Sequence, residues 1–154
     1  MENSTSYTDA VNLLSSSDLI APAYFILGGT EPDEGIVITR DQFELINLWK
    51  LDTKNNIWYL LETNYDHWVP PPANDDRRDP GMKAMNQTTR ANINLDTLLT
   101  VLEIDPVCNK YNSLKIFCMV VVLYNFVLFF SETVYTAIMS ASLEGDDGFK
   151  LTIH

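Results

Sequence analysis

Four short runs of β-branched and aromatic residues follow one another between residues 23 and 63, with turn signals between the first and second runs and between the third and fourth. The intervening residues include Gly-Gly, Pro-Asp-Glu-Gly and Thr-Lys-Asn-Asn, which favour tight turns. Runs of this length and composition are typical of strands. The pattern predicts an antiparallel meander of four strands, formed by Ala23 to Leu27, Gly35 to Thr39, Phe43 to Leu51 and Ile57 to Thr63.

The second of these runs lacks a polar face. Ile36 and Ile38 point one way along an extended chain, and Val37 and Thr39 point the other way, so neither face is strongly polar. A strand of this kind is typical of a sheet that is covered on both sides. The sequence therefore predicts an α/β (α+β) fold with an antiparallel sheet in a layered arrangement, rather than a sheet with one face in solvent.

Two segments carry apolar residues at helical spacing. The first follows Ser6, which is placed to cap a helix, with Asp9 three residues further on. The second follows Asn94, another residue favoured at helix starts, and ends before Pro106. Both segments are predicted to form short amphipathic helices. Their apolar positions are Tyr7, Ala10, Val11 and Leu14 in the first, and Leu95, Leu98, Leu99 and Leu102 in the second.

The stretch from Asn64 to Pro80 has no periodicity and contains four prolines, which predicts a long loop. Long ordered loops often carry function. Asn64 stands at the predicted strand end, where its amide could donate to an oxyanion, and Arg77 follows thirteen residues later. In the competing interpretation Asn64 starts a turn and Arg77 pairs with Asp75 or Asp79, and spacing alone favours that one.

Charge and the metal-binding residue types limit the classes of partner. Acidic residues outnumber basic ones by 21 to 10, the formal net charge is −11, and no run of Lys or Arg could follow a phosphate backbone. Nucleic acid is therefore not expected as a partner. With only two cysteines and two histidines, the sequence predicts no disulfide framework, no metal cluster and no cofactor.

An apolar run covers Ile116 to Phe130 and is interrupted only by Asn125. As a helix it would reach roughly 22 Å, short of the about 30 Å of a bilayer core. Two further strands are expected after it, Val134 to Met139 and Phe149 to Ile153, joined by an acidic turn from Glu144 to Gly148.

Several longer motifs together resemble one known family. They are Ala21 to Gly29, Glu34 to Arg40, Thr63 to Trp68, Asp75 to Arg78 and Lys83 to Asn86. These stretches are similar to the acid ceramidase and N-acylethanolamine-hydrolysing acid amidase family, within the N-terminal-nucleophile amidohydrolases. Tyr24 to Gly29 looks like acid ceramidase, whereas Gly29 to Arg40 and Asn64 to Trp68 look more like the acylethanolamine amidase.

The resemblance implies a layered αββα fold and a lysosomal enzyme that cleaves its own precursor, exposing an N-terminal cysteine on its β-subunit. That cysteine attacks the carbonyl of a lipid amide, and the thioester is then hydrolysed. Asn64 matches the family's oxyanion asparagine and Arg77 its second active-site arginine. The nucleophile belongs to an earlier segment, and neither Cys108 nor Cys118 lies in a matching context.

The implied substrate is an N-acylethanolamine, with ceramide as the alternative. A second alternative is a catalytically inactive fragment or splice product that acts only through interactions. The implied partners are the α-subunit and the remainder of the β-subunit. Met1 to Tyr7 lacks the plan of a signal peptide, so secretory targeting is expected upstream. Asn3 and Asn86 lie in glycosylation sequons, which fit a secretory precursor.

The chain departs from the family pattern after Pro106. We expect residues 1–109 to match the C-terminal part of the amidase β-subunit, residues 110–132 to be an atypical apolar insert, and residues 133–154 to be C-terminal strands of the same domain. Three interpretations of the insert stay open. It is a translated intron, a membrane-associating segment, or an extra core helix or strand packed on the sheet.

Overall fold

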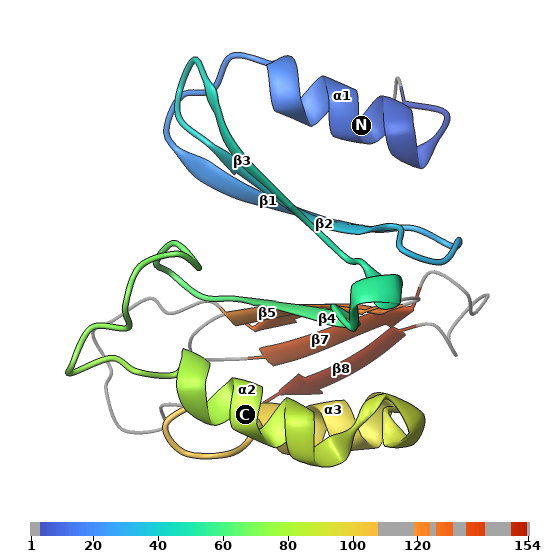
Figure 1. Cartoon of the computed structure of the whole chain (residues 1–154), viewed down its shortest axis with the longest axis vertical. Helices are drawn as coiled ribbons and strands as arrows, with labels where there is room; N and C mark the ends of the chain where they lie inside the picture. The colour runs from blue at the N-terminus through green and yellow to red at the C-terminus, as the bar shows by residue number, and fades with distance from the viewer. Residues whose placement is uncertain (1–3, 108–118, 124–125, 131–134, 141–148, 154) are drawn as a thin grey trace. The chain divides into compact units, whose positions relative to one another are not determined.

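The computed structural model describes residues 4–107, 119–123, 126–130, 135–140 and 149–153. By contacts the chain divides into two compact units. The first is built mainly from Met1–Leu60, and the second mainly from Leu61–Val121 together with later segments. Figure 1 shows the elements of both units with the labels used below.

The first unit opens with helix α1, Tyr7–Ser16, at the predicted place. Oγ of Ser6 accepts a hydrogen bond from the backbone N–H of Asp9 at 3.1 Å. This bond satisfies one of the N–H groups that a helix start leaves without a partner inside the helix. The predicted cap and its helix are therefore confirmed.

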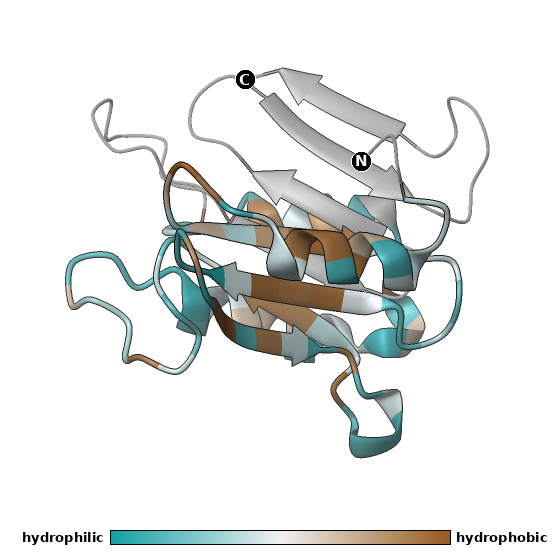
Figure 2. Cartoon of the chain, turned by 90° about the horizontal axis from the view of Figure 1, so that it is seen from above, coloured by the Kyte–Doolittle hydropathy of each residue, from teal (hydrophilic) through white to brown (hydrophobic). Residues whose placement is uncertain are grey.

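The sheet of the first unit contains strands β1, β2 and β3 in that order, spanning Ala23–Gly28, Gly35–Arg40 and Leu45–Lys50. All pairs are antiparallel, and Ile38 of β2 lies opposite Phe25 on one side and Leu48 on the other. Every residue of β2 is buried. The expectation that this strand is covered on both faces is confirmed, whereas β3 lies at the edge and is largely exposed. Figure 2 shows apolar residues along the strands, with polar residues in much of the connecting loops.

A buried arginine ties the helix of this unit to its sheet. The guanidinium of Arg40, at the end of β2, donates to the carbonyl oxygens of Leu14 at 2.6 Å and Ser17 at 2.7 Å. Its Nε donates to the carbonyl oxygen of Glu44 at 3.0 Å. These carbonyls belong to the end of α1, the segment after it and the turn before β3. Arg40 is thus a structural cross-link.

The boundary between the two units falls within strand β4, Tyr59–Glu62, and here one prediction is wrong. The expected four-strand meander ends after three strands, because β4 instead heads a five-stranded sheet with the order β4-β5-β6-β7-β8. The chain changes sheet within a short connection that contains the 3-10 turn η1, Thr53–Asn55, and the isolated bridge between Asp52 and Ile57. Strand composition alone does not reveal which neighbour a strand pairs with.

Helix α2, Arg78–Thr88, was not predicted, and it corrects the expected loop end at Pro80. Pro80 is the third residue of this helix. A proline is tolerated there because the first N–H groups of a helix have no partner within it. Oδ1 of Asp76 accepts from the N–H of Asp79 at 3.1 Å and supports the first turn.

The second predicted helix is confirmed as α3, Leu95–Leu102, which follows the 3-10 turn η2, Arg90–Asn92. Oδ1 of Asn94 accepts from the N–H groups of Asp96 and Thr97, and Oγ1 of Thr97 accepts from the N–H of Asn94. This reciprocal capping box explains why the helix starts where it does. Leu98 and Leu102 are fully buried.

Strands also occur within the apolar run. They are β5, Met119–Leu123, and β6, Phe126–Phe130. Of the interpretations of the insert, a helix over these residues is therefore wrong, and an extra strand is supported. The two expected C-terminal strands are confirmed as β7, Tyr135–Ser140, and β8, Phe149–Ile153, an antiparallel pair with Ala137 opposite Leu151. The acidic turn expected between them lies outside the described residues. In the part of the chain that is described, no helix has the length and apolar character that crossing a bilayer requires.

Candidate active site

The candidate site begins where β4 ends. Glu62 and Thr63 are buried, and the next residue, Asn64, is exposed. The backbone N–H of Thr63 donates to Oε1 of Glu62 at 3.0 Å, and its Oγ1 donates to the carbonyl oxygen of Tyr65 at 3.4 Å. The chain therefore turns sharply at the strand end and brings Asn64 out of the buried strand.

The two residues predicted for catalysis lie in direct contact. Nη2 of Arg77 donates a hydrogen bond to Oδ1 of Asn64. The same guanidinium also holds Asp75, with Nε of Arg77 at 2.9 Å from Oδ1 and Nη2 at 3.4 Å from Oδ2. Arg77 is only 2% exposed. The competing interpretation, an Arg77–Asp75 pair, is therefore also present, and the guanidinium serves both partners at once.

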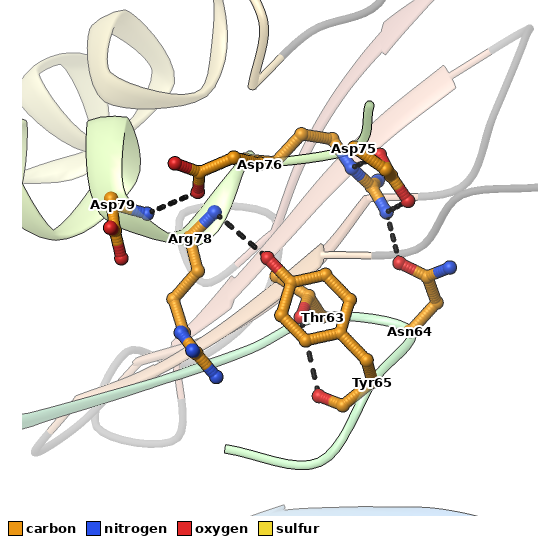
Figure 3. A network of polar contacts seen from close by, with 8 residues as sticks. Thr63, Asn64, Tyr65, Asp75, Asp76, Arg78 and Asp79 are labelled. Atoms are coloured by element: carbon orange, nitrogen blue, oxygen red, sulfur yellow. Dashed lines mark hydrogen bonds and ion pairs between the residues drawn. The ribbon is translucent and has the colours of Figure 1, made fainter. Parts of the chain in front are cut away.

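This contact determines which way the amide of Asn64 faces. A guanidinium has donors and no acceptor, so the Asn64 atom next to Arg77 must be the carbonyl oxygen Oδ1 rather than Nδ2. Figure 3 shows the amide nitrogen of Asn64 directed away from this bond. Among the described residues, Nδ2 of Asn64 donates to none. The exposed asparagine thus presents two N–H donors in an orientation that a buried charge maintains.

Arg78 holds the segment that follows Asn64, a role that the sequence did not indicate. Its guanidinium donates to the carbonyl oxygens of Asp66, His67 and Val69, at 3.3, 3.1 and 2.6 Å. It also lies 5.1 Å from the ring centroid of Tyr65, at the distance of a cation–π contact. The two adjacent arginines therefore divide the work, Arg77 holding the Asn64 side chain and Arg78 the backbone from Asp66 to Val69.

Glu62 and His67 are the ionisable groups with altered properties beside this turn. Burial raises the pKa of Glu62 to about 7, with a further increase from the charge of Asp66, against the hydrogen bond from Thr63 and the charge of Arg78. Burial lowers the pKa of His67, and Arg78 acts in the same direction while Asp66 opposes it. Both shifts favour uncharged side chains.

The predicted glycosylation sites and the two cysteines lie outside this cluster of contacts or outside the described residues. Asn86 lies on an exposed position of α2, whereas Asn3, Cys108 and Cys118 lie outside the described residues. No group of His, Cys, Asp and Glu that could hold a metal ion occurs among the described residues. Arg78 ends one of the family motifs and Glu62 directly precedes another, but an isolated Glu or an Arg-Arg pair carries no sign of its burial.

No family model matches the chain. Individual relatives do: the chain is 43% identical over 142 residues to N-acylethanolamine-hydrolyzing acid amidase of Mus musculus, covering 92% of this chain and 33% of that protein. It is 49% identical over 110 residues to acid ceramidase of Homo sapiens, covering 71% of this chain and 28% of that protein.

A solved structure is similar along the whole chain. The Caenorhabditis elegans N-acylethanolamine-hydrolyzing acid amidase ortholog matches with a TM-score of 0.75 and 28% identity over 99% of this chain and 57% of that one. The likeness confirms the predicted mixed α/β fold with antiparallel sheet. The chain spans about a third of the length of the curated relatives it matches.

Proposed function

Since this chain belongs to the amidohydrolase family of N-acylethanolamine-hydrolysing acid amidases and acid ceramidases, we propose that it forms part of a lipid-amide hydrolase. The role proposed for it is to supply the oxyanion-stabilising side chain, Asn64, and the arginine that orients it, Arg77. One contact supports this role most directly. The buried guanidinium of Arg77 holds Oδ1 of Asn64, so that the two N–H donors face away from it.

The proposed reaction needs a donor at a place where negative charge develops. A cysteine sulfur, supplied by a segment outside this chain, attacks the amide carbon, and the carbonyl oxygen becomes an oxyanion. Nδ2 of Asn64 donates to that oxygen, a contact worth about 10²- to 10³-fold in rate when a single such donor is removed. Collapse of the intermediate breaks the C–N bond, the proton given up by the thiol goes to the leaving amine, and a thioester remains. Water then hydrolyses the thioester to the fatty acid and the free thiol.

Arg77 acts in this scheme as a positioning residue. Its positive charge next to Oδ1 withdraws electron density from the amide of Asn64, which makes the N–H groups stronger donors. Because Asp75 holds the other side of the guanidinium, the arginine is itself fixed. An amide oriented before the substrate arrives avoids the cost of reorganisation during the reaction.

The proposed substrate is an N-acylethanolamine, cleaved to a fatty acid and ethanolamine. The match to the acylethanolamine amidase extends over 142 residues, against 110 for acid ceramidase, and this favours the first assignment. Ceramide, cleaved to sphingosine and fatty acid, is the alternative, supported by the higher identity of the shorter match, 49% against 43%.

The remainder of the amidase precursor is the proposed partner. Strand β3 and the turn before it carry apolar side chains in solvent, with Phe43 75% and Ile46 50% exposed. An apolar edge strand of this kind favours pairing with another polypeptide. We assign that place to the α-subunit and the rest of the β-subunit, in a glycosylated lysosomal protein modified at Asn3 and Asn86.

The second candidate function is that of an inactive fragment, because neither Cys108 nor Cys118 lies in the family's nucleophile context.

The test compares this chain alone with a precursor that carries it joined to the missing segments. Fatty-acid release from an N-acylethanolamine and from ceramide is measured at acidic pH. We expect activity in the precursor, none in the chain alone, and a loss of about 10²-fold or more with Asn64→Ala. Asn12→Ala, an exposed asparagine of α1, is the matched control. Unchanged turnover in Asn64→Ala would remove Asn64 from the mechanism.

A further inference from the structure

A buried carboxyl group lies directly before the turn that presents Asn64. Glu62 is the last residue of β4 and is 2% exposed. Its Oε1 accepts from the N–H of Thr63, but Oε2 is buried and has no hydrogen-bond partner among the described residues. An ionised carboxylate in this position leaves Oε2, which shares the charge, without a donor among the described residues. A proton on Oε2 removes the charge and creates a donor.

A group that can use this donor stands at the other end of the turn. Nδ1 of His67 lies 3.9 Å from Oε2 of Glu62, which is longer than a hydrogen bond, so sharing a proton requires the two side chains to approach each other by about 1 Å. The ring of His67 rests edge-on against Trp68, with the centroids 4.8 Å apart. A neutral imidazole accepts at one nitrogen, so O–H of Glu62 can donate to Nδ1 of His67.

The charges around the pair come from the loop and from the start of α2. Asp66 stands beside both groups on the loop, and its charge raises the pKa of each. Arg78 faces them from α2, and its charge lowers the pKa of each. These two charges act in opposite directions, so burial dominates, placing the pKa of Glu62 at about 7 and that of His67 below its usual range. Between those two pKa values the pair carries one proton.

We propose that Glu62 and His67 share a single proton, and that this proton holds the turn from Thr63 to Asp66 in the geometry that presents Asn64. Glu62 fixes the start of the turn by accepting a hydrogen bond from the N–H of Thr63, and the shared proton links it to His67 after the end of the turn. Loss of the proton leaves a buried anion beside Asp66, which is relieved when the turn opens. Glu62 and His67 are thus positioning residues. The consequence for catalysis rests on the function proposed above, whereas the shared proton does not.

The test is a pH titration of the 154-residue chain by NMR, over about pH 5 to 8, following the side-chain amide of Asn64 and the imidazole of His67. We expect both to report the same transition near pH 7, where Glu62 loses its proton. Glu62→Gln keeps an acceptor for Thr63 and a donor for His67, so this transition should disappear. Glu103→Gln, which removes a carboxyl from an exposed position after α3, should leave it in place.

A second variant keeps the proposal testable if Glu62→Gln does not fold. Asp66→Asn removes the neighbouring negative charge, so the transition should move to lower pH. A transition that persists in Glu62→Gln, an unmoved transition in Asp66→Asn, or an Asn64 amide that does not follow the titration overturns the shared proton.

Activity is a separate readout. In an active precursor, Glu62→Gln should move the alkaline limb of the kcat profile upward by about one pH unit. A precursor without activity would count against the proposed function and leave the NMR result standing.

Discussion

Arg77 donates to Oδ1 of Asn64 across thirteen residues while its Nε pairs with Asp75 at 2.9 Å, so one buried guanidinium links an exposed amide to an acidic side chain. The chain between them is a loop with three consecutive prolines, Pro70 to Pro72. The contact arises because α2 starts at Arg78 and fixes the residue before it against the end of β4. The orientation of Asn64 therefore depends on the helix start as well as on its own strand.

The first prediction concerns Arg77→Met in an active precursor. The amide of Asn64 loses the charge that orients it, so kcat should fall by about 10- to 100-fold while KM changes little. The measurement is steady-state fatty-acid release. Arg77→Lys keeps the positive charge but lacks the planar guanidinium that can contact Asn64 and Asp75 at once. Its kcat should lie between those of the parent enzyme and Arg77→Met. If Arg77→Met raises KM alone, the guanidinium contributes to substrate binding rather than to orientation.

The second prediction concerns the structural arginine of the first unit. Arg40→Met removes three charge-assisted hydrogen bonds to the carbonyl groups of Leu14, Ser17 and Glu44. We expect the free energy of unfolding to fall by about 2 to 4 kcal/mol, measured by urea denaturation. Lys50→Met makes the same charge change on the exposed edge strand and should cost far less. Equal losses in both variants would mean that the three bonds contribute little.

The third prediction concerns the loop that Arg78 holds. In Arg78→Ala the carbonyl oxygens of Asp66, His67 and Val69 lose their donor. The N–H of Val69, which donates to the carbonyl oxygen of Asp66, should then exchange with solvent about 10- to 100-fold faster. Hydrogen exchange followed by NMR measures this, with the N–H of Leu98 in α3 as the internal reference. Unchanged protection of the Val69 N–H would show that the loop keeps its conformation without the hydrogen bonds from Arg78.

The fourth prediction concerns stability against pH. The folded-state pKa of Glu62, about 7, lies above the ordinary value of 4.5, so the folded state binds this proton more tightly. The contribution of protonated Glu62 to the free energy of unfolding is fully present below pH 4.5 and is lost as the pH rises to about 7. This effect is on the order of 3 kcal/mol. His67, whose pKa is lowered, acts in the opposite direction, with its contribution lost as the pH falls through that pKa.

Urea denaturation at several pH values tests this expectation. Glu62→Gln should flatten the decline of stability between pH 4.5 and 7 relative to the parent chain. His67→Gln should remove the opposing contribution and leave the decline in place. A decline that is the same in Glu62→Gln and the parent chain would show that another group causes it.

Local patterns along the chain determined most of the secondary structure. Ser6 and Asn94 cap their helices because a side-chain oxygen of each accepts hydrogen bonds from N–H groups of the first turn. These bonds join residues close in sequence and require no distant partner. The stretch from Ile36 to Thr39, in which neither face is strongly polar, likewise indicated a strand covered on both sides, and every residue of β2 is buried. These features depend on neighbours within a few positions, so the sequence alone is sufficient for them.

Tertiary structure decided what depends on distant neighbours. β4 resembles the strands before it, yet it pairs in the other sheet, because register and partner follow from which surfaces can be buried together. Proximity of Asn64 and Arg77 was expected only through family resemblance, and the geometry added that Oδ1 of Asn64 is the atom held. The burial of Glu62, and with it the altered pKa, cannot be read from a glutamate in a sequence, since desolvation depends on residues brought around it by folding.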